Sequence, residues 1–382
     1  MTSAGLGALF GALTPIGALL LLAPLEYGQF SIVYLLFAFG FSIQYSVISD
    51  AWNRATVLSG NASSARSYGS ALVDLSLLFG LASAIVSLAL VGLRPLWWVY
   101  GLAVFFALYR GGRRYYAVAA GQSRRIAVSD ISGILGFAFS LALCLQFGPE
   151  AAVAISWLVA STLSGLILKM PSRSRGEGLA AWCRHHWTSI KPLLVDSLFM
   201  DAGAIGTPFL LAGFMGSAKF GIYRAVSNVA MPVRLIIEPI RPRLGQMSPS
   251  RLLGMAASIV IGGAALVLTV ACYLALALIV PALPFEVGTL TALGAHAFST
   301  SLFVAGNLLG TVYYIACRAS SPGRDIFIGR ATQTALVIAL PLAGFAIDDL
   351  SGAIWGFSVS SLISAMVWLY LAWRVARSTH LK

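Results

Sequence analysis

Charged residues are scarce in this sequence: Asp, Glu, Lys and Arg make up 10% of its 382 residues, whereas a soluble domain carries about 25%. Hydrophobic residues make up 59%. Too few polar side chains are present to cover the surface of a soluble protein of this length. The composition therefore predicts a protein that is embedded in a lipid bilayer.

Alternation of apolar and polar residues, which is typical of the strands of a membrane β-barrel, is also missing. Instead, apolar runs of about 20 residues recur along the chain, and each is long enough to cross the hydrocarbon core as a helix. The sequence predicts an all-α polytopic membrane protein with about twelve transmembrane helices. The predicted spans are residues 5–23, 30–51, 69–92, 95–117, 127–147, 150–169, 192–215, 220–243, 252–280, 288–316, 327–347 and 350–373.

Cysteine is rare as well, and its four positions show no ligand spacing, so we predict no disulfide and no metal site. No nucleophile–base pair or metal motif appears, and we predict no catalytic residue and no cofactor. His185 and His186 lie in a basic stretch between Trp182 and Trp187. This pattern favours an amphipathic segment on the membrane surface over a metal site.

The distribution of the basic residues predicts the topology. The net charge of +12 could suit a nucleic-acid partner, but with both termini in the cytoplasm only Arg94 and Lys219 fall in external connections. This is the positive-inside bias of a membrane protein, and the basic loops need no partner other than the headgroups of membrane lipids. We therefore predict no nucleic-acid partner. The predicted external side carries Glu26, Glu150, Glu286, Asp348 and Asp349.

An internal repeat is visible in two pairs of segments. "TPIGALLLLAPLEYGQF" (residues 14–30) returns as "TPFLLAGFMGSAKFGIY" (residues 207–223), at an offset of 193. "RRYYAVAAGQSRR" (residues 113–125) resembles "TVYYIACRASSPGR" (residues 311–324), with the paired tyrosines offset by 198. The offsets carry the first span onto the seventh and the fourth onto the tenth. Since six is an even number, the halves enter the membrane from the same side and form a parallel repeat.

The repeat predicts the domain organisation. We expect a six-helix lobe over residues 1–170, a basic cytoplasmic linker over residues 171–191 and a second six-helix lobe over residues 192–382, around a central cleft. Pro15 and Pro208 occupy matching positions, and we expect each to kink the first helix of its half, since proline removes an intrahelical hydrogen bond. The alternative is that proline is simply common in transmembrane helices.

The order of these features resembles the polysaccharide-export branch of the MOP (multidrug/oligosaccharidyl-lipid/polysaccharide) superfamily, over essentially the whole chain. The resemblance is carried by the parallel repeat, by "LEYGQFSIVY" at the start of the second helix and by "LYRGGRRYYAVAAGQSRRIAVSD" after the fourth. It implies a flippase that exports a polyprenyl-pyrophosphate-linked oligosaccharide across the bacterial cytoplasmic (inner) membrane by alternating access. A proton or a sodium ion would be the coupling ion.

Arg110, Arg113 and Arg114 lie in the fourth span, where ionisable residues usually face a cavity or a partner. Guanidinium groups offer the bidentate hydrogen bonds that a diphosphate needs, so these three are candidate substrate-binding residues. The alternatives are that they extend to the cytoplasmic interface or pair with Asp74 or Asp130.

Arg234 and Glu238 are four residues apart in the eighth span, and Asp201 of the seventh span lies at a similar predicted depth. Arg234 is a further candidate for substrate binding. Asp201 and Glu238 are candidates for gating or coupling. A structural ion pair is the alternative for this group.

Two other functions compete with the flippase. A multidrug extruder of the same superfamily would favour an acidic cleft, whereas the charges in the fourth span are cationic. A membrane enzyme of polysaccharide assembly would need catalytic groups at one membrane face, and none is recognisable, so we predict that the protein is not an enzyme.

Overall fold

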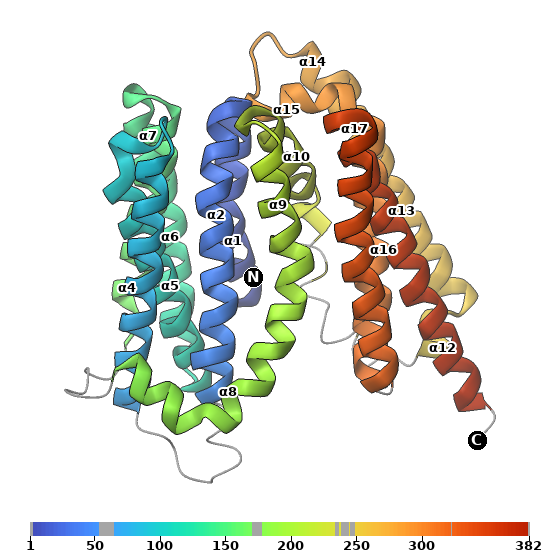
Figure 1. Cartoon of the computed structure of the whole chain (residues 1–382), viewed down its shortest axis with the longest axis horizontal. Helices are drawn as coiled ribbons and strands as arrows, with labels where there is room; N and C mark the ends of the chain where they lie inside the picture. Colours follow the sequence, from blue (N-terminus) through green and yellow to red (C-terminus); the bar gives the residue numbers. More distant parts are fainter. Residues whose placement is uncertain are drawn as a thin grey trace. The chain divides into compact units, whose positions relative to one another are not determined.

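In the computed structural model, the described residues are 3–52, 65–169, 178–233, 237, 244, 249–321 and 323–380. Every regular element in these ranges is helical (Figure 1). Among the described residues, eight helical stretches are long and apolar enough to cross a membrane, and the last of them, residues 324–377, spans 54 residues with a turn at Asp348 and Asp349. The prediction of an all-α polytopic membrane protein is confirmed.

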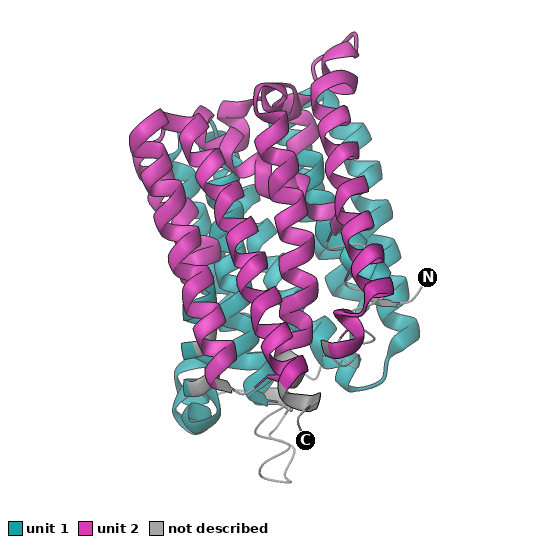
Figure 2. Ribbon diagram, turned by 90° about the vertical axis from the view of Figure 1, so that its right-hand side faces the viewer, with its two compact units in different colours: residues 1–18, 29–201 teal, residues 19–28, 202–382 magenta. Residues whose placement is uncertain are grey.

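The chain forms two compact units (Figure 2). Unit 1 consists of residues 1–18 and 29–201, and unit 2 consists of residues 19–28 and 202–382. The predicted lobe boundaries at residues 170 and 192 stay a prediction.

Unit 1 holds the helices of the first six predicted spans and a further helix, α8. Helix α2 continues directly into a π-helical segment, η1. Helix α8 begins before the seventh predicted span. The elements are α1 (Ser3–Leu21), α2 (Pro24–Gln44), η1 (Tyr45–Ser49), α4 (Ala65–Ala89), α5 (Trp97–Ala119), α6 (Ser123–Cys144), α7 (Pro149–Ile167) and α8 (Leu179–Asp201).

Helices α6 and α7 form a tight hairpin whose turn contains Gly148 at a φ of 100°. A Cβ atom on Gly136 would lie 2.8 Å from Cδ1 of Leu163, so a side chain there would require Leu163 to shift. Small residues at such contacts are the usual basis of helix association in lipid, where apolar burial supplies no driving force.

The first half of α8 packs one face against the rest of unit 1 and leaves the other face exposed. Trp182 donates its indole N–H to the carbonyl oxygen of Val47 at 2.8 Å and stacks on His186. His185 and Trp187 are exposed on the other side. This two-faced pattern is the one expected of an amphipathic segment at a membrane surface.

Unit 2 ends in a helical hairpin, and both of its arms belong to the element labelled α17. Asp348 and Asp349 have non-helical backbone angles, with φ at 48° for Asp349, and the Trp368 indole N–H donates to the Gln333 side-chain oxygen at 3.1 Å. The chain therefore turns back between the eleventh and twelfth predicted spans. The elements of unit 2 are η4 (Ala202–Gly206), α9 (Thr207–Phe214), α10 (Ser217–Val229), α12 (Pro249–Leu252), α13 (Met255–Leu274), η5 (Ala275–Ile279), α14 (Val280–Ala282), α15 (Gly288–Leu293), η6 (Gly294–His296), α16 (Ala297–Ser320) and α17 (Gly323–His380).

The neighbours of each helix follow the same order inside the two units. In unit 1, α5 packs between α4 and α7, and α7 packs on α6. In unit 2, α16 packs between α13 and the second half of α17, which packs on the first half. This correspondence supports the internal repeat.

The corner between α1 and α2 belongs to unit 2, where two glycines make reciprocal contacts. A Cβ atom on Gly28 would lie 1.8 Å from the carbonyl oxygen of Ser217, and one on Gly221 would lie 2.1 Å from that of Pro24. Under the offset of 193, Gly28 corresponds to Gly221 and Pro24 to Ser217. Reciprocal contacts between equivalent residues are what a twofold relation produces.

The predicted kinks fall near the points where the chain changes unit. Pro15 lies inside α1, three residues before the change after Ala18. Pro208 stands at the start of α9, directly after the π-helical segment η4. The kinks themselves stay a prediction.

The topology can be tested at the two ends of α6, where Ser123 and Gln146 are both exposed. In a background without the four native cysteines, we expect a cysteine at Ser123 to react with an impermeant maleimide only from the cytoplasm. A cysteine at Gln146 should react only from outside. Reaction of both from one side would contradict the predicted topology. Cysteine substitutions at Gly148 and Gly288 are avoided as labelling sites, because the positive φ at these positions would strain any side chain.

Candidate functional site

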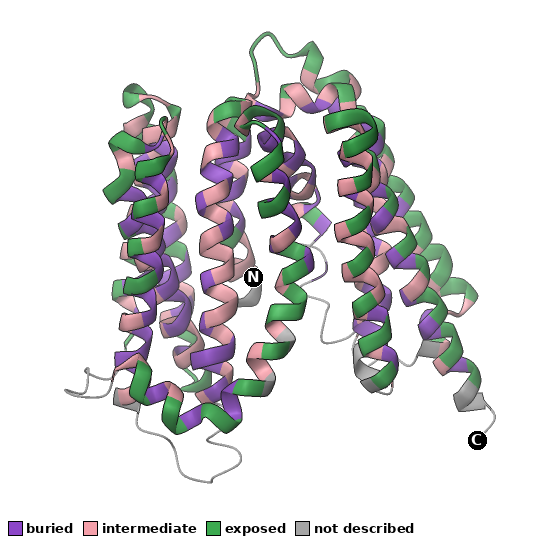
Figure 3. Ribbon diagram, in the orientation of Figure 1, coloured by how far each residue is buried: buried purple, intermediate pink, exposed green. Residues whose placement is uncertain are grey.

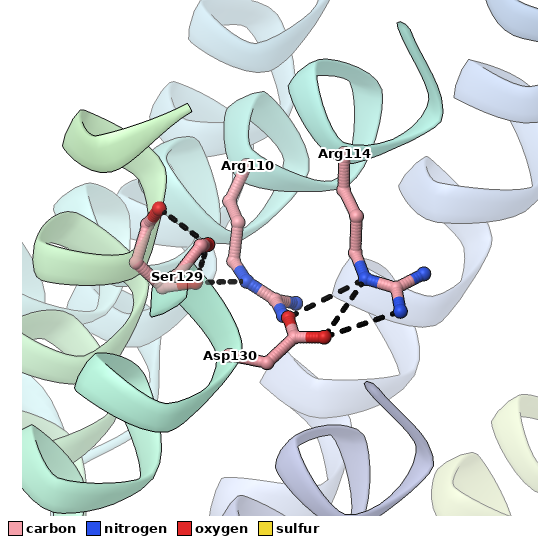
Figure 4. Close-up of polar contacts among 5 residues, drawn as sticks. Arg110, Arg114, Ser129 and Asp130 are labelled. Carbon is pink, nitrogen blue, oxygen red and sulfur yellow. Dashed lines mark hydrogen bonds and ion pairs between the residues drawn. The ribbon is translucent and has the colours of Figure 1, made fainter. Parts of the chain in front are cut away.

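Arg110 is buried in the middle of unit 1, with only 8% of the residue exposed. Its Nη2 donates to Oδ1 of Asp130 on α6 at 2.5 Å, and its Nε donates to Oγ of Ser164 on α7 at 2.6 Å (Figure 4). A buried cation needs such partners, because leaving a charge unpaired inside a protein is costly.

Asp130 is shared between two arginines. Arg114 lies one turn after Arg110 on the same face of α5, and its Nη2 donates to the other carboxylate oxygen, Oδ2, at 3.2 Å. Asp130 is fully buried, whereas the side chain of Arg114 is 25% exposed. Two guanidinium groups on one carboxylate leave the trio with a net charge of +1.

Helix α1 completes the environment of both arginines. The Arg110 guanidinium carbon lies 3.5 Å from the centre of the Phe10 ring, which is a cation–π contact. A Cβ atom on Gly7 would lie 2.3 Å from Nη2 of Arg114, so the absence of a side chain at Gly7 makes room for that guanidinium.

Ser129 holds Ser164, which is the hydrogen-bond partner of Arg110 on α7. Its hydroxyl donates to the backbone oxygen of Ser164 at 2.8 Å, and the two hydroxyl oxygens are also 2.8 Å apart. Ser129 precedes Asp130 on α6, so this contact ties the carboxylate's helix to α7. We call Arg110, Arg114, Asp130, Ser129 and Ser164 the arginine cluster.

The structure separates the partners that the sequence offered for Arg110. Asp130 is the pairing carboxylate, whereas Asp74 accepts the backbone N–H of Leu179 at 3.0 Å, near the start of α8. The third predicted arginine, Arg113, leaves the cluster and lies over the ring of Tyr109 at 5.1 Å. The ion pair does not test substrate binding by any of the three arginines, which stays a prediction.

The second predicted group is described only in part. Asp201 ends α8, and its side chain lies near that of Ser42 of α2. Arg234 and Glu238 lie outside the described residues, so their roles stay predictions. Among the described residues, no group of three or more His, Cys, Asp or Glu side chains could hold a metal ion.

Sequence reasoning missed the contributions of α1 and of a neighbouring polar pair. Phe10 and Gly7 carry no signal of their own, because an apolar residue and a glycine are ordinary in a transmembrane helix. Tyr115, next to Arg114, donates to Oδ1 of Asp50 at 2.8 Å, and the spacing of these residues along the chain gives no hint of that contact.

We expect Asp130→Ala to destabilise the protein more than Arg110→Ala. The first change strands the buried guanidinium of Arg110, whereas the second leaves Asp130 paired with Arg114. Removing one partner of a buried pair costs about 3–5 kcal/mol. Thermal stability in detergent, followed by size-exclusion chromatography after heating, measures the difference.

Asp325→Ala is the matched control, since Asp325 is also buried but its partner Arg374 is 56% exposed and can be hydrated. Its loss should therefore be smaller. Equal losses of thermal stability for Asp130→Ala and Asp325→Ala would show that sharing Asp130 between two arginines adds nothing to stability.

No protein-family model matches this sequence, and no curated protein sequence does. Solved structures match it. Lipid II flippase MurJ in an inward closed conformation aligns with 95% of this chain and 85% of its own, at a TM-score of 0.64 and 11% identity.

An inward-facing multidrug resistance MATE family transporter of the MOP superfamily aligns with 99% of this chain and 96% of its own, at a TM-score of 0.65 and 14% identity. A MATE structure in the bent conformation aligns at a TM-score of 0.55 and 12% identity, over 100% of this chain and 95% of its own. Identities this low establish a common fold alone. The chain therefore has the fold that the flippase MurJ and the MATE transporters share within the MOP superfamily.

Proposed function

We propose that this protein is a flippase that moves a polyprenyl-pyrophosphate-linked oligosaccharide, or a related polysaccharide precursor, across the bacterial cytoplasmic membrane by alternating access. The observation that carries the proposal is the arginine cluster, which has a net positive charge among apolar transmembrane helices. Ionisable groups at such positions are costly and are typical of transport pathways.

The cluster suits an anionic substrate because one of its two arginines, Arg114, is more accessible than the other. Arg110 is buried and held by Asp130 and Ser164, whereas Arg114 is partly exposed and makes the longer contacts to Asp130. A diphosphate could take bidentate hydrogen bonds from Arg114 while Asp130 kept Arg110 as its partner. If the diphosphate replaced Asp130 as the partner of Arg114, Asp130 would still pair with Arg110, and no buried charge would lose its partner.

The remaining assignments belong to the same proposal. Arg110 and Arg113 would support substrate binding beside Arg114, with Arg234 as a further contact. Asp201 and Glu238 would act in gating or in coupling to a proton or a sodium ion. The role would be export for exopolysaccharide or lipopolysaccharide biosynthesis, with both termini in the cytoplasm. The chemistry is binding and release, without making or breaking a bond, in keeping with the transporter fold.

Extrusion of drugs is the second candidate, since the MATE transporters match the fold as well as MurJ does. Cationic drugs would need a negative binding site. The arginine cluster in unit 1 has the opposite sign, which favours an anionic substrate.

We expect Arg114→Gln to abolish flipping of a polyprenyl-pyrophosphate-linked oligosaccharide in proteoliposomes, with normal folded yield, because Asp130 keeps Arg110. Arg114→Lys should restore transport only in part, since an ammonium lacks the bidentate fork. Arg124→Gln is the matched control, because Arg124 is an exposed arginine at the start of α6 and outside the cluster.

Full transport by Arg114→Gln would remove Arg114 from the substrate path. Wild-type transport of a lipophilic cation, with none of the lipid-linked oligosaccharide, would replace the flippase by a drug extruder.

A further inference from the structure

A continuous stripe of aromatic rings follows one face of α2. Phe30, Tyr34, Phe37, Phe41 and Tyr45 succeed one another at intervals of three or four residues, which places them on the same side of the helix. Their successive ring centres lie 5.7, 5.4, 5.8 and 4.7 Å apart. At about 1.5 Å of rise per residue, the stripe extends over roughly 22 Å.

The stripe is buried at one end and partly exposed along the rest. Phe30 is buried against Trp157 of α7, whose ring also contacts Tyr34 and Phe37. Tyr34, Phe37, Phe41 and Tyr45 have intermediate burial, and Figure 3 colours most of α2 as buried or intermediate. Part of each of these four rings is therefore accessible.

The exposed apolar side chains of α4 differ from the stripe in kind. Leu78, Leu81 and Ile85 of α4 are more than half exposed and aliphatic, as suits contact with lipid chains. The stripe instead carries flat rings, two of them with hydroxyl groups. Such a surface combines an apolar face with polar edges.

The other end of the stripe meets the arginine cluster. Tyr45 contacts the ring of Tyr115, the residue after Arg114, at 5.7 Å between ring centres. The cationic site and the aromatic surface are therefore continuous within unit 1.

We propose that the aromatic stripe of α2 is a saccharide-binding track, on which the sugar rings of the substrate stack while its phosphate groups contact Arg114. The inference rests on the proposed function and adds a separate site to it. A pyranose ring presents a face of C–H groups with slightly positive hydrogens, which complements the negative face of an aromatic ring. Stacking of this kind tolerates differences in hydroxyl configuration, so the track would accept more than one sugar.

The spacing of the rings also suits movement. Each ring on the stripe has a neighbour within 6 Å along the helix, so a sugar that leaves one ring reaches the next without losing all its stacking contacts. The charged cluster alone would hold the phosphate groups but would offer nothing to an uncharged glycan.

The test compares two lipids of equal charge in proteoliposomes: a polyprenyl-pyrophosphate-linked tetrasaccharide and polyprenyl pyrophosphate without sugar. The single variants are Tyr34→Leu, Phe37→Leu and Phe41→Leu, which keep an apolar side chain but remove the flat ring. Each should reduce the preference for the tetrasaccharide lipid roughly two- to tenfold. Transport of the sugar-free lipid should be unchanged.

Phe39→Leu is the matched control, because Phe39 lies on the same helix but contacts Phe79 of α4 instead of the stripe. It should keep the wild-type preference. An equal loss in Phe39→Leu, or an unchanged preference in the three stripe variants, would overturn the proposal.

Binding of the free tetrasaccharide, measured by saturation-transfer NMR on the detergent-solubilised protein, separates this site from the proposed function. If the wild type flips neither lipid, the flippase is wrong, and the stripe is upheld only if Phe37→Leu weakens tetrasaccharide binding. If the stripe variants lose binding of tetraphenylphosphonium while tetrasaccharide binding stays the same, the track binds aromatic cations and the saccharide proposal fails.

Discussion

One buried carboxylate organises the core of unit 1. Asp130 cannot lie among transmembrane helices as an isolated anion, and Arg110 cannot lie there as an isolated cation, because the desolvation of either charge is too costly. Their pairing brings α5 against α6, and the bond from Arg110 to Ser164 adds α7. Phe10 then covers the guanidinium with α1. The second arginine, Arg114, shares the same carboxylate, so the trio of Arg110, Arg114 and Asp130 carries a net charge of +1.

Close backbone contact is the second constraint, because helices in lipid associate through packing and hydrogen bonds. In unit 2 the reciprocal contacts of Gly28 and Gly221 leave no space for a side chain on either residue. The buried hydroxyl of Thr289 donates to the carbonyl oxygen of Leu22 at 2.9 Å, and Tyr27 hydrogen-bonds with Asn228. The corner between α1 and α2 is therefore fixed to unit 2, although most of both helices belongs to unit 1.

The sequence predicts the helices well because the bilayer dictates both their length and their composition. Even the turn at Asp348 and Asp349 falls between two predicted spans. The π-helical segments could not be predicted, because hydropathy carries no information about them. Helix α8 begins before its predicted span because an amphipathic helix at a surface needs no long apolar run. For the site, the predicted depth of Arg110 offered Asp74 and Asp130 as partners, and only the packing of α4, α6 and α8 separates them. Contacts from apolar residues of another helix leave no mark in the sequence.

The Thr-Pro dipeptide that occurs in both halves lies close to points where the chain passes between the two units. The chain passes from one unit to the other after Ala18, after Gly28 and after Asp201. The first of these points follows Pro15 within one turn, and the last opens the π-helical segment that leads to Pro208. Proline and π-helical turns both interrupt the regular hydrogen-bond ladder, so bending there breaks fewer bonds than elsewhere in a helix. The proposed alternating access would use bending points outside the binding residues. The irregular turns around Pro15 and Pro208 coincide with two of the three points where the chain passes between its compact units, and no residue of the arginine cluster stands at any of these points.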